Sequence, residues 1–188
     1  MIPSIETCFH IMDKYEMLGN IKAHSVVVAK VAHLIARELL KSGLCISIEK
    51  STAGALLHDI GKTESLKSGL DHSEIGRQIC INNHLDEIAD IVGEHVRLKN
   101  YNMNDECFEK EIVYYSDKRV NHDRIVSLEE RLAYILNRYG RDRQWLCRDI
   151  KENFELCKKI EIKIFKKLSF SPESLSFLVR DEKIGSME

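Results

Sequence analysis

The chain has 188 residues, of which 44% are hydrophobic and 31% charged, with a formal net charge of -2 at pH 7. This length fits one domain that buries a substantial core, with room for a helical extension. The small negative charge argues against duplex nucleic acid as the main partner, since a duplex binder carries a basic surplus. No apolar stretch approaches the ~20 residues that span a bilayer, and the N-terminus lacks the features of a signal peptide. We therefore expect a cytoplasmic protein without a membrane partner.

Cysteine usage fits the same compartment. The six cysteines are scattered and form no CxxC pair: Cys8, Cys45, Cys80, Cys107, Cys147 and Cys157. In a chain of this size they are expected to be reduced, partly buried small hydrophobic residues. A zinc-ribbon or redox motif is the minor alternative.

Apolar residues recur at three- and four-residue steps along most of the chain, which predicts helices. The first predicted helix covers about 21–41, and its apolar face consists of Val28, Val31, Ile35 and Leu39. Ser47 is the expected N-cap of the next helix, which runs through Leu57 into His58. No alternating strand pattern is convincing, so we expect an all-α fold.

Two capping signatures mark later helices. Asp71 with Glu74, and Ser127 with Glu130, have the three-residue spacing of a capping box. The second of these helices is expected to end near Gly140. Between them, two further apolar faces are formed by Ile88, Ile91, Val92 and His95, and by Ile112, Val113, Asp117 and Val120.

The last long segment, from Asp142 to about Lys167, mixes apolar residues at helical spacing with many lysines. It predicts an amphipathic helix that packs on the domain or on a partner, so a homodimer interface is one option. From Ser169 onward we expect a poorly ordered tail. The predicted organisation is a metal-binding domain over 1–140 and a helical extension with a tail over 141–188.

Potential metal ligands lie on these apolar faces. His24 shares its face with Val28, and His95 and Asp117 each fall four residues after an apolar residue. A lone inward histidine is commonly a core residue bonded to a backbone carbonyl. An unpaired aspartate among apolar side chains is expensive, however, and a metal ion supplies the compensating charge.

The adjacent pair His58-Asp59 strengthens this interpretation. Neighbouring residues on a helix point about a hundred degrees apart, so both reach one ion only near a helix end or around a central metal. Gly61 suits such an end. A carboxylate has two oxygens and can bridge two ions, which a neutral imidazole cannot. Mixed histidine and carboxylate ligation suits one or two divalent ions of iron, manganese, zinc or cobalt.

These residues resemble a known family. The order His24, His58-Asp59, Asp117 is similar to that of the HD-domain superfamily of metal-dependent phosphohydrolases, and residues 58–61 match its HDIG variant letter for letter. The resemblance covers roughly residues 20 to 140. It implies a compact bundle of helices with the metal centre at its heart.

Two more histidines extend the resemblance. His72 and His95 occupy places similar to the extra ligands of binuclear HD enzymes, such as bacterial HD-type diadenosine tetraphosphate hydrolases. By that resemblance one ion is held by His24, His58, Asp59 and Asp117. His72 and His95 hold a second ion, with Asp59 bridging. The sequence departs from those hydrolases around residues 58–61 and 117–120, and it lacks the Gly-Tyr-Pro element of the cyclic-dinucleotide phosphodiesterases of the superfamily.

Other residues are weaker candidates. His84 competes with His72 and His95 as a second-site ligand. Three histidines without matching context are expected to be surface or structural residues: His10, His33 and His122. Lys62, directly after the HDIG string, can meet a phosphate oxygen or simply favour a helix end through the dipole. Further candidates for an anion pocket, each with a solvated basic face as the alternative, are Arg77, Lys118, Arg119 and Arg124.

The leading hypothesis is a phosphohydrolase that cleaves a phosphoanhydride or phosphodiester, with a phosphorylated small molecule such as a nucleotide as substrate. Two ions ~3.5–4 Å apart would activate a water for in-line attack on phosphorus, and Asp59 and Lys62 are the expected catalytic residues. Two alternatives stay open. The domain can be a nucleotide-sensing module whose metal anchors a ligand, or the metal can be structural, with every coordination position closed by protein.

Overall fold

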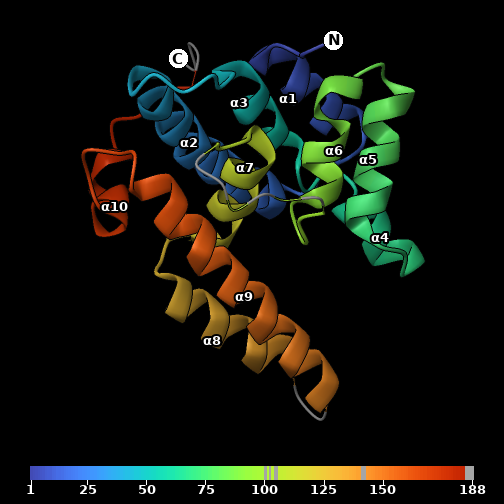
Figure 1. Cartoon of the computed structure of the whole chain (residues 1–188). Coiled ribbons are helices and arrows are strands. Elements are labelled where there is room, and N and C mark those ends of the chain that lie inside the picture. Colours follow the sequence, from blue (N-terminus) through green and yellow to red (C-terminus); the bar gives the residue numbers. More distant parts are fainter. Residues whose placement is uncertain (100, 102, 104–105, 141–142, 185–188) are drawn as a thin grey trace.

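The computed structural model describes residues 1–99, 101, 103, 106–140 and 143–184, and nearly all of its secondary structure there is helical (Figure 1). This confirms the predicted all-α fold. The helices are α1 (Ile5–Lys14), α2 (Gly19–Lys41), α3 (Ile48–Leu57), α4 (Lys62–Ser68), α5 (His72–Asn82), α6 (Asp86–Glu94), α7 (Glu109–Lys118), α8 (Leu128–Tyr139), α9 (Gln144–Phe165) and α10 (Leu175–Leu178). A short hairpin of β1 (Val120–Asn121) and β2 (Arg124–Ile125) joins α7 to α8, and a 3-10 turn (Pro172–Ser174) precedes α10.

Helix α2 forms the centre of the bundle. It packs against α3 and α7, while α3 in turn contacts α1, α6 and α7. The predicted face of Val28, Val31, Ile35 and Leu39 is completely buried. Burial of such side chains contributes about 1.5–3 kcal/mol each, so this face anchors the elements that surround the site.

The predicted N-caps are confirmed. The Ser47 hydroxyl accepts from the Lys50 amide at 3.1 Å, and the Asp71 carboxylate accepts from the Ser73 amide at 2.8 Å. Ser127 and Glu130 form the reciprocal capping box at the start of α8. Side-chain oxygens satisfy amides that have no partner within the helix, and this fixes where α3, α5 and α8 begin.

Besides the 3-10 turn and α10, three elements were not predicted. Helix α1 begins after the N-cap Ser4 and buries Cys8 and Met12, and the short helix α4 directly follows the HDIG string. The hairpin pairs Val120 with Ile125, and its turn residue His122 has a φ of 56°. Helix α4 and the hairpin are too short for a clear period, so tertiary packing decides their structure.

The C-terminal part forms a long helical hairpin. Helices α8 and α9 pack side by side and extend away from the bundle, and α9 also contacts α7 (Figure 1). Asp142, where we expected this helix to begin, lies outside the described residues. The boundary at residue 140 and a dimer interface on this helix stay predictions.

The expectation of a poorly ordered tail after Ser169 is wrong up to Ile184. Leu175, Val179 and Ile184 are buried, and Glu182 accepts a hydrogen bond from Arg37 of α2 at 2.6 Å. The prediction was based on the serine-rich composition and overlooked these three apolar residues, which are spaced four and five residues apart. The tail therefore belongs to the packed structure.

Four of the six cysteines are buried, as expected for small hydrophobic residues. Across the described part of the chain, no helix has the length and apolar character needed to cross a bilayer.

Candidate metal centre

The ends of several helices meet at one place inside the bundle. His58 is the C-cap of α3 and Asp59 follows it, His95 is the C-cap of α6, and His72 is the first residue of α5. The two remaining predicted ligands, His24 and Asp117, come from α2 and α7. All six predicted metal ligands are therefore brought together, although they span more than ninety residues of sequence.

A first group of ligand atoms surrounds Oδ1 of Asp117 and Oδ2 of Asp59. The His24 Nε2 atom lies 3.2 Å from Asp117 Oδ1 and 4.0 Å from Asp59 Oδ2. The His58 Nε2 atom lies 3.6 Å from Asp117 Oδ1 and 3.5 Å from Asp59 Oδ2. Both imidazole nitrogens thus lie within 4 Å of one oxygen of each aspartate.

A second group uses the other oxygen of the same aspartate. The His72 Nε2 and His95 Nε2 atoms lie 3.4 Å and 3.5 Å from Asp59 Oδ1, and 3.1 Å from each other. These atoms are close enough together to hold one ion. Asp59 is shared by the two groups, with one oxygen facing each.

Backbone carbonyls orient three of the imidazoles. The Nδ1 atoms of His24, His58 and His95 lie 2.7, 2.7 and 2.6 Å from the carbonyl oxygens of His122, Ala55 and Val92. A carbonyl can only accept, so each Nδ1 carries a proton, and Nε2 is the nitrogen left to bind a metal ion. The three Nε2 atoms face the two aspartates, and a carbonyl at the other ring nitrogen is the arrangement found where histidines ligate a metal.

Close packing at Gly61 fixes the position of the second group of ligands relative to the first. A Cβ atom on this residue would lie 2.3 Å from the carbonyl oxygen of His72 and 2.6 Å from the amide nitrogen of Gly76. Only a glycine therefore allows the turn after Asp59 to touch the start of α5. This contact places His72 beside Asp59.

The aspartates are charged and His72 is neutral. Burial alone would raise the pKa values of Asp59 and Asp117, but the surrounding histidines and lysines outweigh it and hold both well below the usual range. Burial, together with neighbouring His95, lowers the pKa of His72 to about 4. At neutral pH the cluster therefore offers two carboxylates and the unprotonated imidazole of His72, which are the forms that bind metal.

Two lysines border the cluster. Lys62 Nζ donates to Asp59 Oδ2 at 2.8 Å, and more than a third of its side chain is exposed. Burial opposes its charge, but Asp59, Asp117 and Tyr139 raise its pKa. Lys118 is buried: its Nζ donates to the carbonyl of His95 at 2.8 Å and lies 3.6 Å from Asp117 Oδ2. Burial lowers the pKa of Lys118.

The cluster fits a divalent cation. The Nε2 atom of His58 is completely buried and has no hydrogen-bond partner among the described residues. Such an orphaned acceptor costs on the order of 1–3 kcal/mol. A cation at the point where this nitrogen meets Asp59 and Asp117 would remove that cost and separate the two carboxylate charges.

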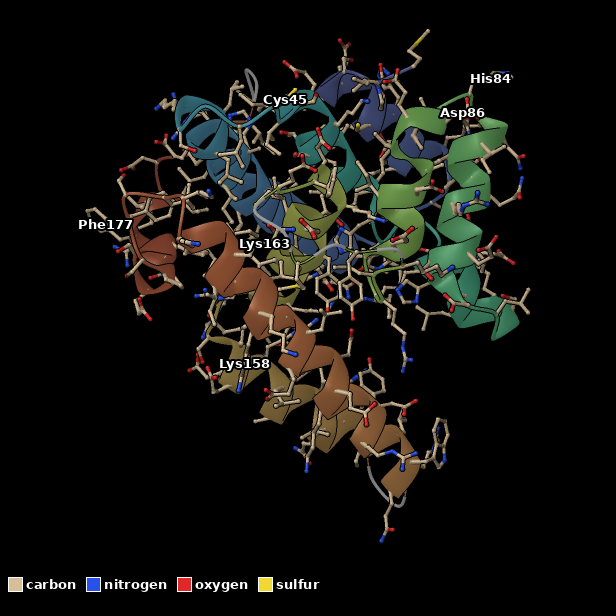
Figure 2. The ribbon with its side chains drawn as sticks, viewed as in Figure 1. Cys45, His84, Asp86, Lys158, Lys163 and Phe177 are labelled. Carbon is tan, nitrogen blue, oxygen red and sulfur yellow. The ribbon has the colours of Figure 1, made fainter. Side chains whose placement is uncertain are left out.

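The structure gives the other candidates different surroundings. His84 is exposed and lies at the outer end of the α5–α6 pair (Figure 2), so it does not join the second group. Arg77 pairs with exposed Asp90 at 3.1 Å. Arg119 is buried, and its guanidinium donates to Tyr115, Glu161 and two backbone carbonyls. These contacts favour structural roles for Arg77 and Arg119 over the predicted substrate binding.

The remaining basic and histidine candidates are also placed. Arg124 lies exposed in the hairpin and His10 on the surface of α1. His33 contacts Thr52 and Glu182. His122, expected to be a surface or structural residue, supplies the carbonyl that orients His24.

The structure also assigns a role to Lys118 that sequence reasoning missed. Its ammonium lies 3.8 Å from the centre of the Tyr114 ring, four residues earlier on α7. That spacing is a recognisable signal for side-chain contact on a helix. Lys118 thus ties the His95 carbonyl to the Asp117 helix and is a positioning residue rather than an open phosphate contact.

Comparison with known proteins agrees with this architecture. The HD domain family matches residues 21–142, well over half of the chain. The chain therefore belongs to the HD-domain family, a superfamily of metal-dependent phosphohydrolases.

Curated relatives share only parts of their length with this chain. Ribonuclease Y of Fervidobacterium nodosum is 40% identical over 77 residues, which cover 40% of this chain and 14% of that protein. A tRNA (cytidine(56)-2'-O)-methyltransferase of Picrophilus torridus is 30% identical over 146 residues, 69% of this chain and 40% of that protein. Ribonuclease Y of Treponema denticola is 35% identical over 99 residues, which cover 52% of this chain and 18% of that protein. No solved structure matches.

Proposed function

We propose that this chain is a phosphohydrolase with a two-ion centre that cleaves a phosphoanhydride or phosphodiester bond of a nucleotide. The observation that carries the proposal is the placement of Asp59 between two separate histidine pairs, with one carboxylate oxygen toward each. A single structural ion would need only one of these groups. A shared carboxylate between two groups is the arrangement expected for a pair of ions.

The ligand sets follow from the distances. His24, His58, Asp59 and Asp117 would hold one ion through the atoms around Asp117 Oδ1. His72, His95 and Asp59 would hold the other. The second set has fewer protein ligands, and part of His72 is exposed, so this side leaves room for water or substrate. Nitrogen and oxygen ligands without thiolate suit iron, manganese, zinc or cobalt.

When bound, such ions supply Lewis acidity for phosphoryl oxygens and lower the pKa of a water toward neutrality. The chain's own residues do the rest. Asp59 fixes the spacing of the two sets, and the carbonyl-bound imidazoles keep their lone pairs aimed inward. Lys62 reaches the centre from the exposed side, where its ammonium can donate to a phosphate oxygen as a point charge.

Two resemblances support a nucleotide substrate. The extra ligands His72 and His95 resemble those of bacterial HD-type diadenosine tetraphosphate hydrolases, which favours a phosphoanhydride. Two of the relatives are named Ribonuclease Y, which favours a phosphodiester of RNA. Diadenosine tetraphosphate is a phosphorylated small molecule and RNA is a chain of nucleotides. Recognition of either one requires no duplex.

The test is hydrolysis by protein loaded separately with manganese, iron, zinc and cobalt. The substrates are diadenosine tetraphosphate, a short single-stranded oligoribonucleotide and a nucleoside monophosphate. We expect one of the first two to be cleaved, with activity abolished by a chelator and restored by metal. Tight binding without turnover would instead establish a nucleotide sensor. Unfolding on metal removal, with no hydrolysis by the loaded protein, would establish a structural metal.

A further inference from the structure

One side of α8 carries a row of basic and aromatic side chains. Arg131, Tyr134 and Arg138 follow one another at three- and four-residue steps, which places them on one flank of the helix. Tyr139 joins the row at its far end, where its hydroxyl lies 3.2 Å from Arg138 Nε. The two arginines are separated by about 10 Å along the helix axis.

The row begins beside the metal centre. Arg131 Nη1 donates to Asn121 of the hairpin at 2.9 Å, and the Tyr134 ring lies 5.3 Å from that of His122. The carbonyl of His122 is the group that orients His24. At the other end of the row, Tyr139 is, after Asp59 and Asp117, among the groups that raise the pKa of Lys62. The flank therefore runs along the same side of the molecule as the centre.

Among the described residues, no carboxylate pairs with an arginine of this row. Their contacts there are with neutral groups: the Asn121 amide and the rings of Tyr134 and Tyr139. The Nε of Arg131 is buried without a hydrogen-bond partner in that part of the chain. The acidic residues of α8 are engaged elsewhere, Glu129 with Lys158 at 3.5 Å and Glu130 in the capping box. An anion can therefore approach without displacing an ion pair of the described residues.

We propose that this flank of α8 binds the part of a nucleotide ligand that extends beyond the scissile phosphate, with the arginines on phosphates and the tyrosines against bases. The inference rests on the proposed function, because it names a subsite for that substrate. Arginine presents a planar fork of donors to phosphate oxygens, and aromatic rings accept any base by stacking. A span of about 10 Å exceeds one phosphate group, so the ligand carries more than one nucleotide.

A groove on α9 is the competing site. It has a volume of about 930 Å³ and is lined by Tyr101 and by several residues of α9, including Arg148, Lys151 and Lys159. Arg148 and Glu152 lie 3.9 Å apart, and Glu155 also lines the groove. Since carboxylates share this surface, α8 is the better candidate for the substrate.

The test measures binding in the full chain treated with chelator, where hydrolysis cannot occur. The probes are a fluorescently labelled single-stranded oligoadenylate and a labelled diadenosine tetraphosphate, which separate the two sources of the shared chemistry. We expect Arg138→Gln to weaken binding about tenfold and to lower the dependence on salt by about one phosphate contact. Tyr134→Leu should also weaken binding roughly tenfold, and Tyr134→Phe should retain it.

The matched control is Arg148→Gln on the other helix of the hairpin, which removes the same charge from an exposed side chain and should leave binding unchanged. Binding that is insensitive to Arg138→Gln, or sensitive mainly to Arg148→Gln, would overturn the inference, as would absence of binding by the unmodified chain. The two proposals fail separately. Binding that depends on Arg138, without hydrolysis after metal loading, would support the subsite and refute the proposed hydrolase. Hydrolysis together with binding that does not depend on Arg138 would support the hydrolase and refute the subsite.

Discussion

Helix α7 contributes to two clusters of buried charged groups that differ in one respect. Near its start, both carboxylate oxygens of Glu111 accept from Lys163 Nζ at 2.8 Å, and Arg119 at its end pairs with Glu161 at 3.1 Å. Asp117, on the same helix, instead faces the Nε2 atoms of His24 and His58. In the first cluster each charge meets a side chain of opposite charge. In the second, two carboxylates share one group of imidazole nitrogens.

This difference separates structural polar groups from a site. A buried pair such as Glu111 and Lys163 is complete in itself and holds α9 against α7. The histidine and aspartate cluster brings two carboxylates and several imidazole nitrogens within 3–4 Å of one another, and a cation between them would offset the repulsion of the two negative charges. Burial alone does not distinguish the two clusters, since Glu111 and His58 are both completely buried.

The largest effect is expected from Asp59→Asn. An amide keeps the shape but loses the charge and one of the two bridging acceptors, so both ions should bind weakly and kcat/KM should fall at least roughly a thousandfold. The fold should persist, as judged by circular dichroism. Asp90→Asn, which alters an exposed aspartate paired with Arg77, is the control and should retain activity. Loss of activity with unchanged metal content would show that Asp59 does not hold the ions.

Disrupting the pair of Glu111 and Lys163 should lower stability without removing metal, in contrast to Asp59→Asn. Glu111→Gln leaves the ammonium of Lys163 buried without its carboxylate, which is expected to lower the free energy of unfolding by about 3–5 kcal/mol. Urea denaturation measures this change, and the folded protein should retain its metal. Glu155→Gln, in an exposed pair with Lys158, should change the free energy of unfolding little. If Glu111→Gln instead removed metal, the two clusters would not be separable.

A smaller effect on the centre is expected from Lys118→Met. Methionine fills similar space but loses the bond to the His95 carbonyl and the charge beside Asp117. Removal of such a supporting contact typically costs 10–100-fold in metal affinity or activity. Competition with a metal-sensitive dye measures the affinity directly. Unchanged affinity would limit Lys118 to packing against Tyr114.

Much of this arrangement could be predicted from the sequence because it depends on local rules. The apolar face of α2 and the caps Ser47, Asp71 and Ser127 follow from helical period and side-chain hydrogen bonds. The ligands on apolar faces could be recognised because a buried aspartate without a partner is expensive. The end of α3 at the HDIG string could be predicted because Gly61 suits a helix end and because the neighbours His58 and Asp59 reach one ion only near such an end.

The features that could not be predicted from the sequence depend on contacts between residues far apart along the chain. The carbonyl of His122 meets His24 across 98 positions, and no local pattern indicates that contact. Arg119 was expected at an anion pocket, with a solvated basic face as the alternative, yet tertiary packing buries it against Glu161 and the C-terminal segment. The row on α8 had a visible signal, arginines seven residues apart with a tyrosine between them, but its meaning depends on the nearby centre.

The central claim is that Asp59 joins two ion sites, and the most direct measurement is the metal content of protein purified without chelator and without air. We predict about two ions per chain, falling to about one in His72→Ala, because His72 contributes only to the second group. The matched control is His84→Ala, which alters an exposed histidine and should retain both ions. One ion in both the unmodified chain and His72→Ala would contradict the account.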